Sequence, residues 1–426
     1  MKLNEHPLRR QVVGEMHLRR WPRIAAPMQI LQVLRIVSPE ELEAERAMLA
    51  ALPPGGELAP SDNPRHAEGT LGPGISFVWE QHSEACGITL FLGQGEGDTR
   101  AAIAWVERFP GQAMRATRIH VVADEAEAQA MLPQLGFVGS DMVSCHIGVT
   151  PGLLAAGMRP VRLWSDFRAG PEGLGISLIA VNDAAGSDLA RLLQRFQELG
   201  NYRNLALMGL PMARACWPRL DASEAALRAL ATDVASPAIS DDALLERVSV
   251  LSLDLMSLAT ETSYRMSATS AYAQLVEERL AGLSSRSIPG YPGLDDFTQR
   301  RLLPAIRTAQ AYRNRLDDVT ARAAHFTSLL RTRVETRIEN QNGRLLRSME
   351  RSSSLQLRLQ QLVEGLSVVA LSYYGISLIG YMLKGAEHRF EQIPAPEIMG
   401  VLVPVVVFAM WKGLHRMKAK VLGEHH

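Results

Sequence analysis

Few residues of this chain have the types and spacing that catalysis or metal binding requires. Cys145 and His146 are adjacent on a predicted β-strand, where neighbouring side chains point to opposite faces, so the two cannot form a nucleophilic pair. His82 and His120 could approach His146 in the fold, yet the spacing of the three does not demand a metal ion. We expect all of them to be ordinary core or surface residues.

Two short motifs are equally weak. The glycine-rich run Leu92–Arg100 (LGQGEGDTR) lacks the Lys and Ser/Thr of a phosphate-binding loop, and its Glu96 and Asp98 would repel a phosphate. The pair Glu15 and His17 is too short a motif to support a zinc site alone. We therefore predict no catalytic residue, no metal site and no cofactor, and a protein that is not an enzyme.

A third group of polar residues lies inside an apolar segment. Gly365–Leu383 (GLSVVALSYYGISLIGYML) has no charge over 19 residues, which is about the length that crosses the roughly 30 Å hydrocarbon core of a bilayer. Within it, Ser372 and Gly375 supply small or hydroxyl groups, and the phenol of Tyr373 needs a hydrogen-bond partner rather than lipid. This face is either a helix contact or the lining of a pore.

Further polar residues would extend a pore. Glu364 stands at the inner end of the span, where an ionisable group is a functional candidate by default. Glu391 and Glu397 would stand at the outer mouth, where rings of carboxylates concentrate cations. The full set of candidate pore-lining residues is Asn342, Ser352, Gln356, Glu364, Ser372, Tyr373, Gly375, Glu391 and Glu397.

A long helix must carry most of these residues. The chain has no proline between Pro304 and Pro394, and one helix from there to Leu383 would contain 79 residues. At about 1.5 Å per residue it would span roughly 120 Å, too far to fold back inside a small globule. We expect a stalk or a coiled coil.

An apolar seam follows this stalk in alternating steps of four and three residues, which is the pattern of helices that pack against partners. Its members are Ile338, Asn342, Leu345, Met349, Ser352, Gln356, Leu359, Val363, Leu366 and Ala370. The seam predicts a homo-oligomer joined through the long helix and first span, although the chain's own helix Asp241–Leu283 is an alternative partner. The polar members either fix the register or line a wet axis.

A second apolar segment, Ile398–Trp411 (IMGVLVPVVVFAMW), follows the first after the short link Lys384–Gln392 and completes a predicted hairpin. A re-entrant or interfacial segment is the alternative. Arg and Lys are frequent before the first span and after the second, and positive residues mark the cytoplasmic side. We therefore predict a multi-pass protein of the plasma (inner) membrane, with a cytoplasmic N-terminal domain and C-terminus.

The N-terminal part has the pattern of a mixed α/β domain, with β-rich runs bounded by Gly, Pro, Asp or Asn. The predicted strands are Ile30–Val37, Ile75–Glu80, Gly87–Leu92, Thr117–Val122, Met142–Val149, Val161–Phe167 and Gly175–Val181; the predicted helices are Pro39–Leu52, Thr99–Phe109 and Glu125–Leu135. Pro53–Gly74 is predicted to be a loop. After it come predicted helices at Ala190–Leu199, Tyr202–Cys216, Ser223–Thr232 and Asp241–Leu283, and a connector at Ser284–Pro292.

The predicted fold class is therefore α+β with four parts. They are a mixed α/β cytoplasmic domain (1–189), a helical domain with the long stalk helix (190–361), a two-span transmembrane hairpin (362–412) and a basic cytoplasmic tail (413–426).

The composition excludes several classes of protein. Hydrophobic residues make up 47% of the chain, enough for a buried core. Lys plus Arg and Asp plus Glu number 45 each, which argues against a nucleic-acid partner. Three scattered cysteines are too few for a disulfide framework and fit a reducing compartment. Because the N-terminus is charged where a secretory signal is apolar, we expect no export of the first part.

Several runs carry a resemblance to a known family. The opening Asn4–Leu8 (NEHPL), Glu15–Arg19 (EMHLR), Arg300–Thr308 (RRLLPAIRT), Leu329–Val334 (LLRTRV) and Leu355–Tyr374 (LQLRLQQLVEGLSVVALSYY) resemble the uncharacterised membrane-anchored family called domain of unknown function 3422. Trp21-Pro22 stands where that family is expected to have an Arg-Pro-Phe-like run. The family has no established activity, so this resemblance implies membrane anchoring without a mechanism.

The architecture is also similar to that of CorA-type magnesium channels, which are pentamers around the first span. The Gly-Met-Asn that follows that span in those channels is missing here, where Gly380–Gly385 reads GYMLKG. Two functions therefore stay open. One is a CorA-like oligomeric channel or transporter, for divalent cations among other ions. The other is a membrane-anchored scaffold or tether whose cytoplasmic domain binds a protein partner. Residues 286–361 carry fourteen Arg against seven acidic residues, which favours an anion or an acidic partner.

Overall fold

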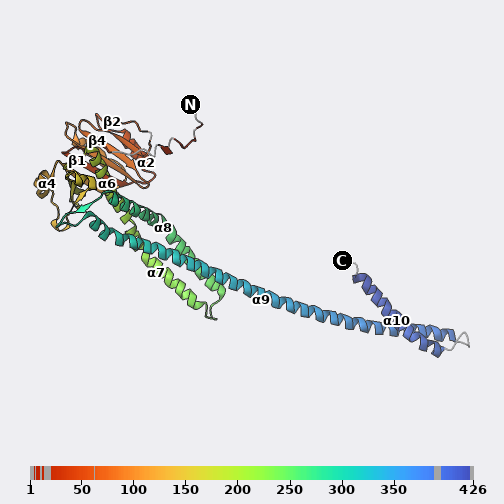
Figure 1. Ribbon diagram of the computed structural model, residues 1–426. Helices are drawn as coiled ribbons and strands as arrows, with labels where there is room; N and C mark the ends of the chain where they lie inside the picture. The colour runs from red at the N-terminus through yellow and green to blue at the C-terminus, as the bar shows by residue number, and fades with distance from the viewer. Residues whose placement is uncertain are drawn as a thin grey trace. The chain divides into compact units, whose positions relative to one another are not determined.

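The computed structural model of the chain describes residues 21–61, 63–387 and 395–422, and before them residues 4, 6–9, 12 and 13. The chain divides into two compact units, residues 1–327 and 328–426. The first unit holds the sheet and most of the helices, and the second holds the end of one long helix and the last helix (Figure 1). Glu15, His17 and Glu391, which the sequence singled out, lie outside the described residues.

Ten strands in the first unit form a single mixed sheet. In chain order they are β1 (Met28–Ile36), β2 (Glu57–Leu58), β3 (His66–Thr70), β4 (Ile75–Gln81), β5 (Ala85–Leu92), β6 (Gln112–Val122), β7 (Val143–Ile147), β8 (Val161–Ala169), β9 (Gly175–Ala180) and β10 (Arg286–Ser287). Across the sheet the order is β10-β7-β8-β9-β6-β1-β5-β4-β3-β2, and the neighbours are antiparallel except β6 and β9. All seven predicted strands are confirmed, although several ends differ.

Three strands are missing from the sequence-based prediction. β2 and β3 lie within Pro53–Gly74, which was predicted to be a loop, and β10 lies within the connector Ser284–Pro292. All three are short and lack an alternating apolar pattern, and two of them stand at the edges of the sheet. Pairing with an existing neighbour determines such strands, and a single sequence does not show that pairing.

Helices surround the sheet and continue beyond it. They are α2 (Leu42–Ala50), α3 (Thr99–Glu107), α4 (Glu125–Met131), α5 (Pro151–Ala155), α6 (Gly186–Leu207), α7 (Gly209–Asp233), α8 (Asp241–Gly282), α9 (Leu294–Glu387) and α10 (Ala395–Leu422), with single 3₁₀ turns η1 (Leu132–Gln134) and η2 (Gly139–Asp141). The carboxylate of Asp98 caps α3, that of Asp124 caps α4, and the hydroxyl of Ser240 caps α8, each by accepting a first-turn N–H. The predicted helices α2, α3, α4 and α8 are confirmed.

The prediction of three short helices after Ala190 is wrong. The structure has two longer ones, α6 and α7, and α6 runs through Gly200 and Asn201, residue types that usually end helices. The chain breaks instead at Met208, and α7 accommodates Pro218 in its interior. The contacts of Gly200 and Asn201, described below, explain why α6 continues.

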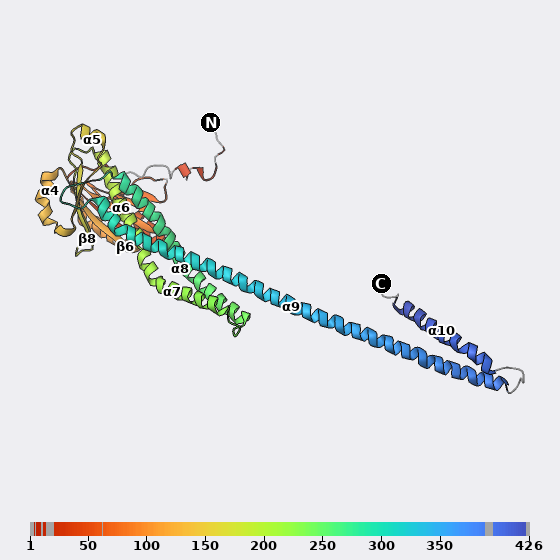
Figure 2. The ribbon, with the colours of Figure 1, turned by 60° about the horizontal axis from the view of Figure 1, so that its bottom comes forward.

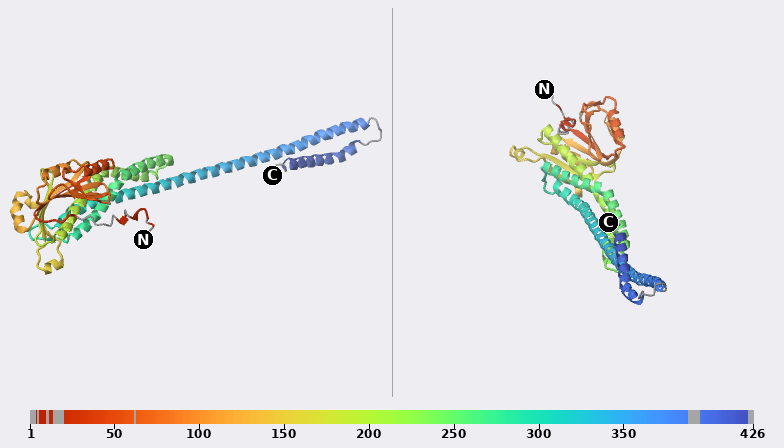
Figure 3. Two further views of the ribbon diagram at one scale, coloured as in Figure 1. Left: turned by 90° about the horizontal axis from the view of Figure 1, so that it is seen from above. Right: turned by 90° about the vertical axis from the view of Figure 1, so that its right-hand side faces the viewer.

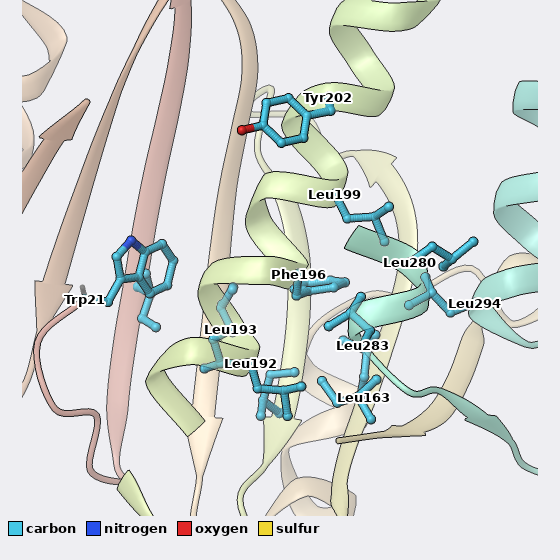
Figure 4. Close-up of a cluster of buried hydrophobic side chains, with 14 of the residues drawn as sticks. Trp21, Leu163, Leu192, Leu193, Phe196, Leu199, Tyr202, Leu280, Leu283 and Leu294 are labelled. Carbon is cyan, nitrogen blue, oxygen red and sulfur yellow. The ribbon is translucent and has the colours of Figure 1, made fainter. Parts of the chain in front are cut away.

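One face of the sheet is covered by α6. Leu193, Phe196 and Leu199 of this helix share a core with Leu163 of β8 and with Leu280 near the end of α8 (Figure 4). On the other face, α2 and α3 cover the strands around β1, β4 and β5, and α4 covers a smaller cluster around β9. The sheet is therefore buried on both sides, which explains why its central strands are almost continuously apolar.

Within the first unit, α7, α8 and the start of α9 lie side by side (Figure 2). The ring of Tyr312 in α9 is buried 5.8 Å from that of Trp217 in α7. The guanidinium of Arg315 bonds the carboxylates of Asp221 and Glu224, both in α7. An apolar core and an ion-pair network therefore join α9 to α7.

The predicted long helix is confirmed as α9, and its 94 residues extend beyond the predicted ends. It begins ten residues before Pro304, which it accommodates. In the second unit, α10 runs antiparallel to the end of α9 (Figure 3). A Cβ placed on Gly375 would lie 3.7 Å from side-chain atoms of Val406 and Met410, and one on Gly380 would lie 3.1 Å from Met399. Small residues of α9 therefore set this close contact.

Candidate functional site

The seam of α9 lies on the surface of the second unit. Its apolar members Ile338, Leu345, Met349, Leu359, Val363 and Leu366 are between 50% and 74% exposed. The three polar candidates of the stalk, Asn342, Ser352 and Gln356, are exposed beside them. A row of exposed apolar residues of this kind, with polar residues between them, is typical of an interaction surface.

Three pore candidates within the first span do not share one environment. Ser372 is 3% exposed, and Gly375 lies on the same face of α9 against Val406 and Met410 of α10. Tyr373 is 68% exposed and contacts the ring of Tyr374. The structure thus brings Ser372 and Gly375 together at a helix contact and leaves Tyr373 outside it.

The remaining predicted residues stand apart. Glu364 is half-buried on α9, directly before the apolar stretch, and Glu397 is exposed in the first turn of α10. Among the described residues, one helix, α9, is long and apolar enough to cross a membrane by length and composition. Those residues also contain no group of three His, Cys, Asp or Glu side chains that could hold a metal ion.

The first unit contains a polar cavity that the sequence does not predict. It has a volume of about 190 Å³ and lies where β6, the β8–β9 hairpin and α6 meet. Its charged lining residues are Arg115, Arg168 and Arg203, and no described Asp or Glu lines it. β6 pairs with β9 only from Thr117 onward. The residues of β6 before Thr117 therefore have no described strand on that side, and most of them line the cavity.

Arg115 is held in a fixed orientation by neutral groups. It donates to Oε1 of Gln32 at 3.2 Å, to Oδ1 of Asn201 at 2.9 Å and to Oε1 of Gln197 at 2.7 Å. Its guanidinium lies directly on the backbone of α6, because a Cβ at Gly200 would stand 2.5 Å from Nη2. These contacts explain the Gly-Asn pair inside α6.

Arg203 lies in an aromatic setting. Its guanidinium carbon is 4.8 Å from the ring centre of Phe167 and 5.7 Å from that of Phe297, and the two rings stack 4.7 Å apart. Phe167 has a left-handed backbone with φ of 52°, a strained conformation for a bulky residue that often marks a functional position. Burial lowers the pKa of Arg203 to about 10, and burial together with the charge of Arg203 lowers the pKa of Arg115 to about 9.

No sequence motif predicts this cavity. Arg115 and Arg203 are 88 positions apart, and Arg is abundant throughout the chain. The one sequence signal related to it is the Gly200-Asn201 pair within a strong helical pattern, which predicts a helix end.

One protein family model, described as protein of unknown function (DUF3422), matches residues 4–421 of the chain. The chain belongs to the DUF3422 family. The resemblance predicted from the N-terminal and stalk motifs is therefore confirmed over nearly the whole length. No curated protein matches this DUF3422 chain, and no comparison supports the weaker resemblance to CorA-type channels.

Proposed function

We propose that the protein is a membrane-anchored, homo-oligomeric scaffold that presents its first unit to a protein partner in the cytoplasm. The exposed seam of α9 is the observation that carries this proposal. Arginines such as Arg344, Arg347 and Arg351 lie on the other faces of the same stretch of helix, so this part of α9 does not lie in lipid. A second copy of the same seam can cover it.

The anchor in this proposal is a hairpin made of the end of α9 and of α10. Gly365–Leu383 supplies the first span, and Ile398–Trp411, which lies within α10, supplies the second. The close contact of Gly375 and Gly380 with α10 supports the pairing of the two segments. The positive residues at both far ends favour a cytoplasmic location for the first unit and the C-terminus.

Labelling of single cysteines in intact cells tests this topology. Because Cys86, Cys145 and Cys216 are all buried, wild-type chains should give little background. An impermeant maleimide should label Lys384→Cys, which lies between the spans, but neither Arg344→Cys nor Arg416→Cys. Labelling of Arg416→Cys together with Lys384→Cys would show that the second segment does not return through the membrane.

A CorA-like channel or transporter is the second candidate, and one observation favours it. The hydroxyl oxygen of Ser372 is buried and has no hydrogen-bond partner in the described chain. An unpaired hydroxyl at mid-span is costly in a lipid-facing protein and is useful beside an ion or water path. Asn342, Ser352 and Gln356 would continue that path through an assembled stalk, and Glu364, Glu391 and Glu397 would line its two ends.

Flux measurements decide between the two functions. In liposomes with fluorescent magnesium and anion reporters, the scaffold predicts no flux from the folded oligomer. The channel predicts flux that Ser372→Leu abolishes, whereas Tyr374→Leu, at an exposed neighbouring position, leaves it intact. Flux that shows this dependence on Ser372 would contradict the scaffold function and support the channel function.

A further inference from the structure

The cavity of the first unit has a charge pattern that a purely structural cavity rarely has. Two arginines, Arg115 and Arg203, line it from a strand and a helix, and neither forms an ion pair within the described chain. The third, Arg168, is held at the rim by the carboxylate of Asp141. Withdrawing an unpaired guanidinium from water is costly, so two of them side by side need an explanation.

The partners of Arg115 orient its charge without neutralising it. All three are side-chain amide oxygens, and they take up three of the five N–H donors of the guanidinium. Gln197 is itself fixed by Thr117, whose hydroxyl accepts from Nε2 at 2.8 Å. The arrangement leaves a preorganised cation with donors to spare at the wall of the cavity.

Arg203 keeps all of its N–H donors available. Its contacts in the described chain are the faces of Phe167 and Phe297, which hold the flat guanidinium by cation–π attraction and accept no conventional hydrogen bond. The strained backbone of Phe167 places one of these rings. Arg203 is thus positioned by packing, and it lines the cavity without a hydrogen-bond partner from the described chain.

The geometry points to a binding site in this cavity for a phosphate group, carried by a small phosphate monoester or present as inorganic phosphate, with Arg115 and Arg203 as its two ligands. Guanidinium forks match phosphate oxygens, and two adjacent positive charges favour a dianion over a monoanionic carboxylate. The volume of about 190 Å³ admits a phosphate and a few further atoms. This site lies in the first unit and does not depend on the scaffold or channel function.

Calorimetric titration of the full-length protein in detergent tests the site. Inorganic phosphate and glycerol 3-phosphate at pH 7.5 should each bind at one site per chain. Arg203→Gln should weaken both at least tenfold, and Arg203→Lys, which keeps the charge but loses the fork, should weaken them less. Arg159→Gln, at an exposed arginine paired with Asp183, should bind as wild type.

Two further measurements separate binding from structural support. Because Arg203 has no ion-pair partner and loses only its cation–π contacts, the Tm of Arg203→Gln without phosphate should stay within a few degrees of wild type, whereas unfolding of the variant would explain a loss of binding without a site. Ala113→Trp should block the mouth of the cavity without removing a charge, and should also weaken binding at least tenfold.

Water-soluble dihexanoyl phosphatidic acid identifies the source of the phosphate. If this lipid binds with the same dependence on Arg203 while glycerol 3-phosphate binds weakly, the site takes a lipid headgroup. If glycerol 3-phosphate binds more tightly than the lipid, the site takes a free metabolite. Absence of binding for all three probes overturns the proposal. So does unchanged binding in folded Arg203→Gln and Ala113→Trp.

Discussion

At the scale of single residues, Gly200 is a position where the fold leaves no room for a side chain. Its Cα faces the guanidinium of Arg115, and a Cβ there would lie 2.5 to 2.7 Å from three atoms of that group. Arg115 cannot swing away freely, since three amide oxygens hold it. The helix therefore tolerates glycine at this position despite its low helix propensity.

Gly200→Ala should lower the free energy of unfolding by about 1–3 kcal/mol, because overpacking must displace a fixed side chain. Gly343→Ala is the matched control, since its Cβ would meet only the far end of Arg347, at 3.9 Å. That change should be neutral or stabilise the helix by up to about 1 kcal/mol. Chemical denaturation of both variants measures the difference, and equal stabilities would contradict the packing described for Arg115.

At the scale of elements, Glu224 is one of the carboxylates that join α7 to α9. Glu224 accepts from Arg315 and from Arg322, and these hydrogen bonds hold its pKa below the usual value of 4.5. A carboxyl group with a lowered pKa in the folded state contributes stability that is fully present above its unfolded pKa. That contribution is lost as the pH falls through the folded pKa.

Thermal unfolding between pH 6 and pH 3 should therefore show a loss of stability that Glu224→Gln reduces. The variant should be less stable than wild type at pH 6 and should approach it at pH 3. Glu277→Gln, at an exposed position of α8, should keep the full pH dependence. If Glu224→Gln were as acid-sensitive as wild type, the link between α7 and α9 would not contribute to this pH dependence.

The sequence predicted elements where local pattern decides them. Apolar runs bounded by turn residues identified seven of the strands, and a proline-free periodic stretch identified α8 and most of α9. It failed at β2, β3 and β10, whose formation depends on a neighbouring strand, and at Gly200-Asn201, where a contact with Arg115 overrides local propensity. The pairing of Arg115 with Arg203 in the cavity could not be predicted from the sequence for the same reason, because only the fold brings these two positions together.

At the scale of the whole molecule, the proposed scaffold requires a partner that covers the seam of α9. The described chain leaves that seam exposed, and the alternative partner α8 packs with α6 and α7 in the first unit. A second copy of the chain satisfies the same pattern without any further component. Assembly through this face also brings several first units together, as a scaffold requires.

Cysteine cross-linking in native membranes tests this central claim most directly. Met349→Cys places a thiol on the seam, and Arg347→Cys places a thiol at another exposed position, on the opposite face of α9 two residues earlier. Mild oxidation should convert most of the Met349→Cys chains to a covalent dimer and should leave Arg347→Cys monomeric. Equal cross-linking of the two variants, or none in either, would contradict assembly through the seam.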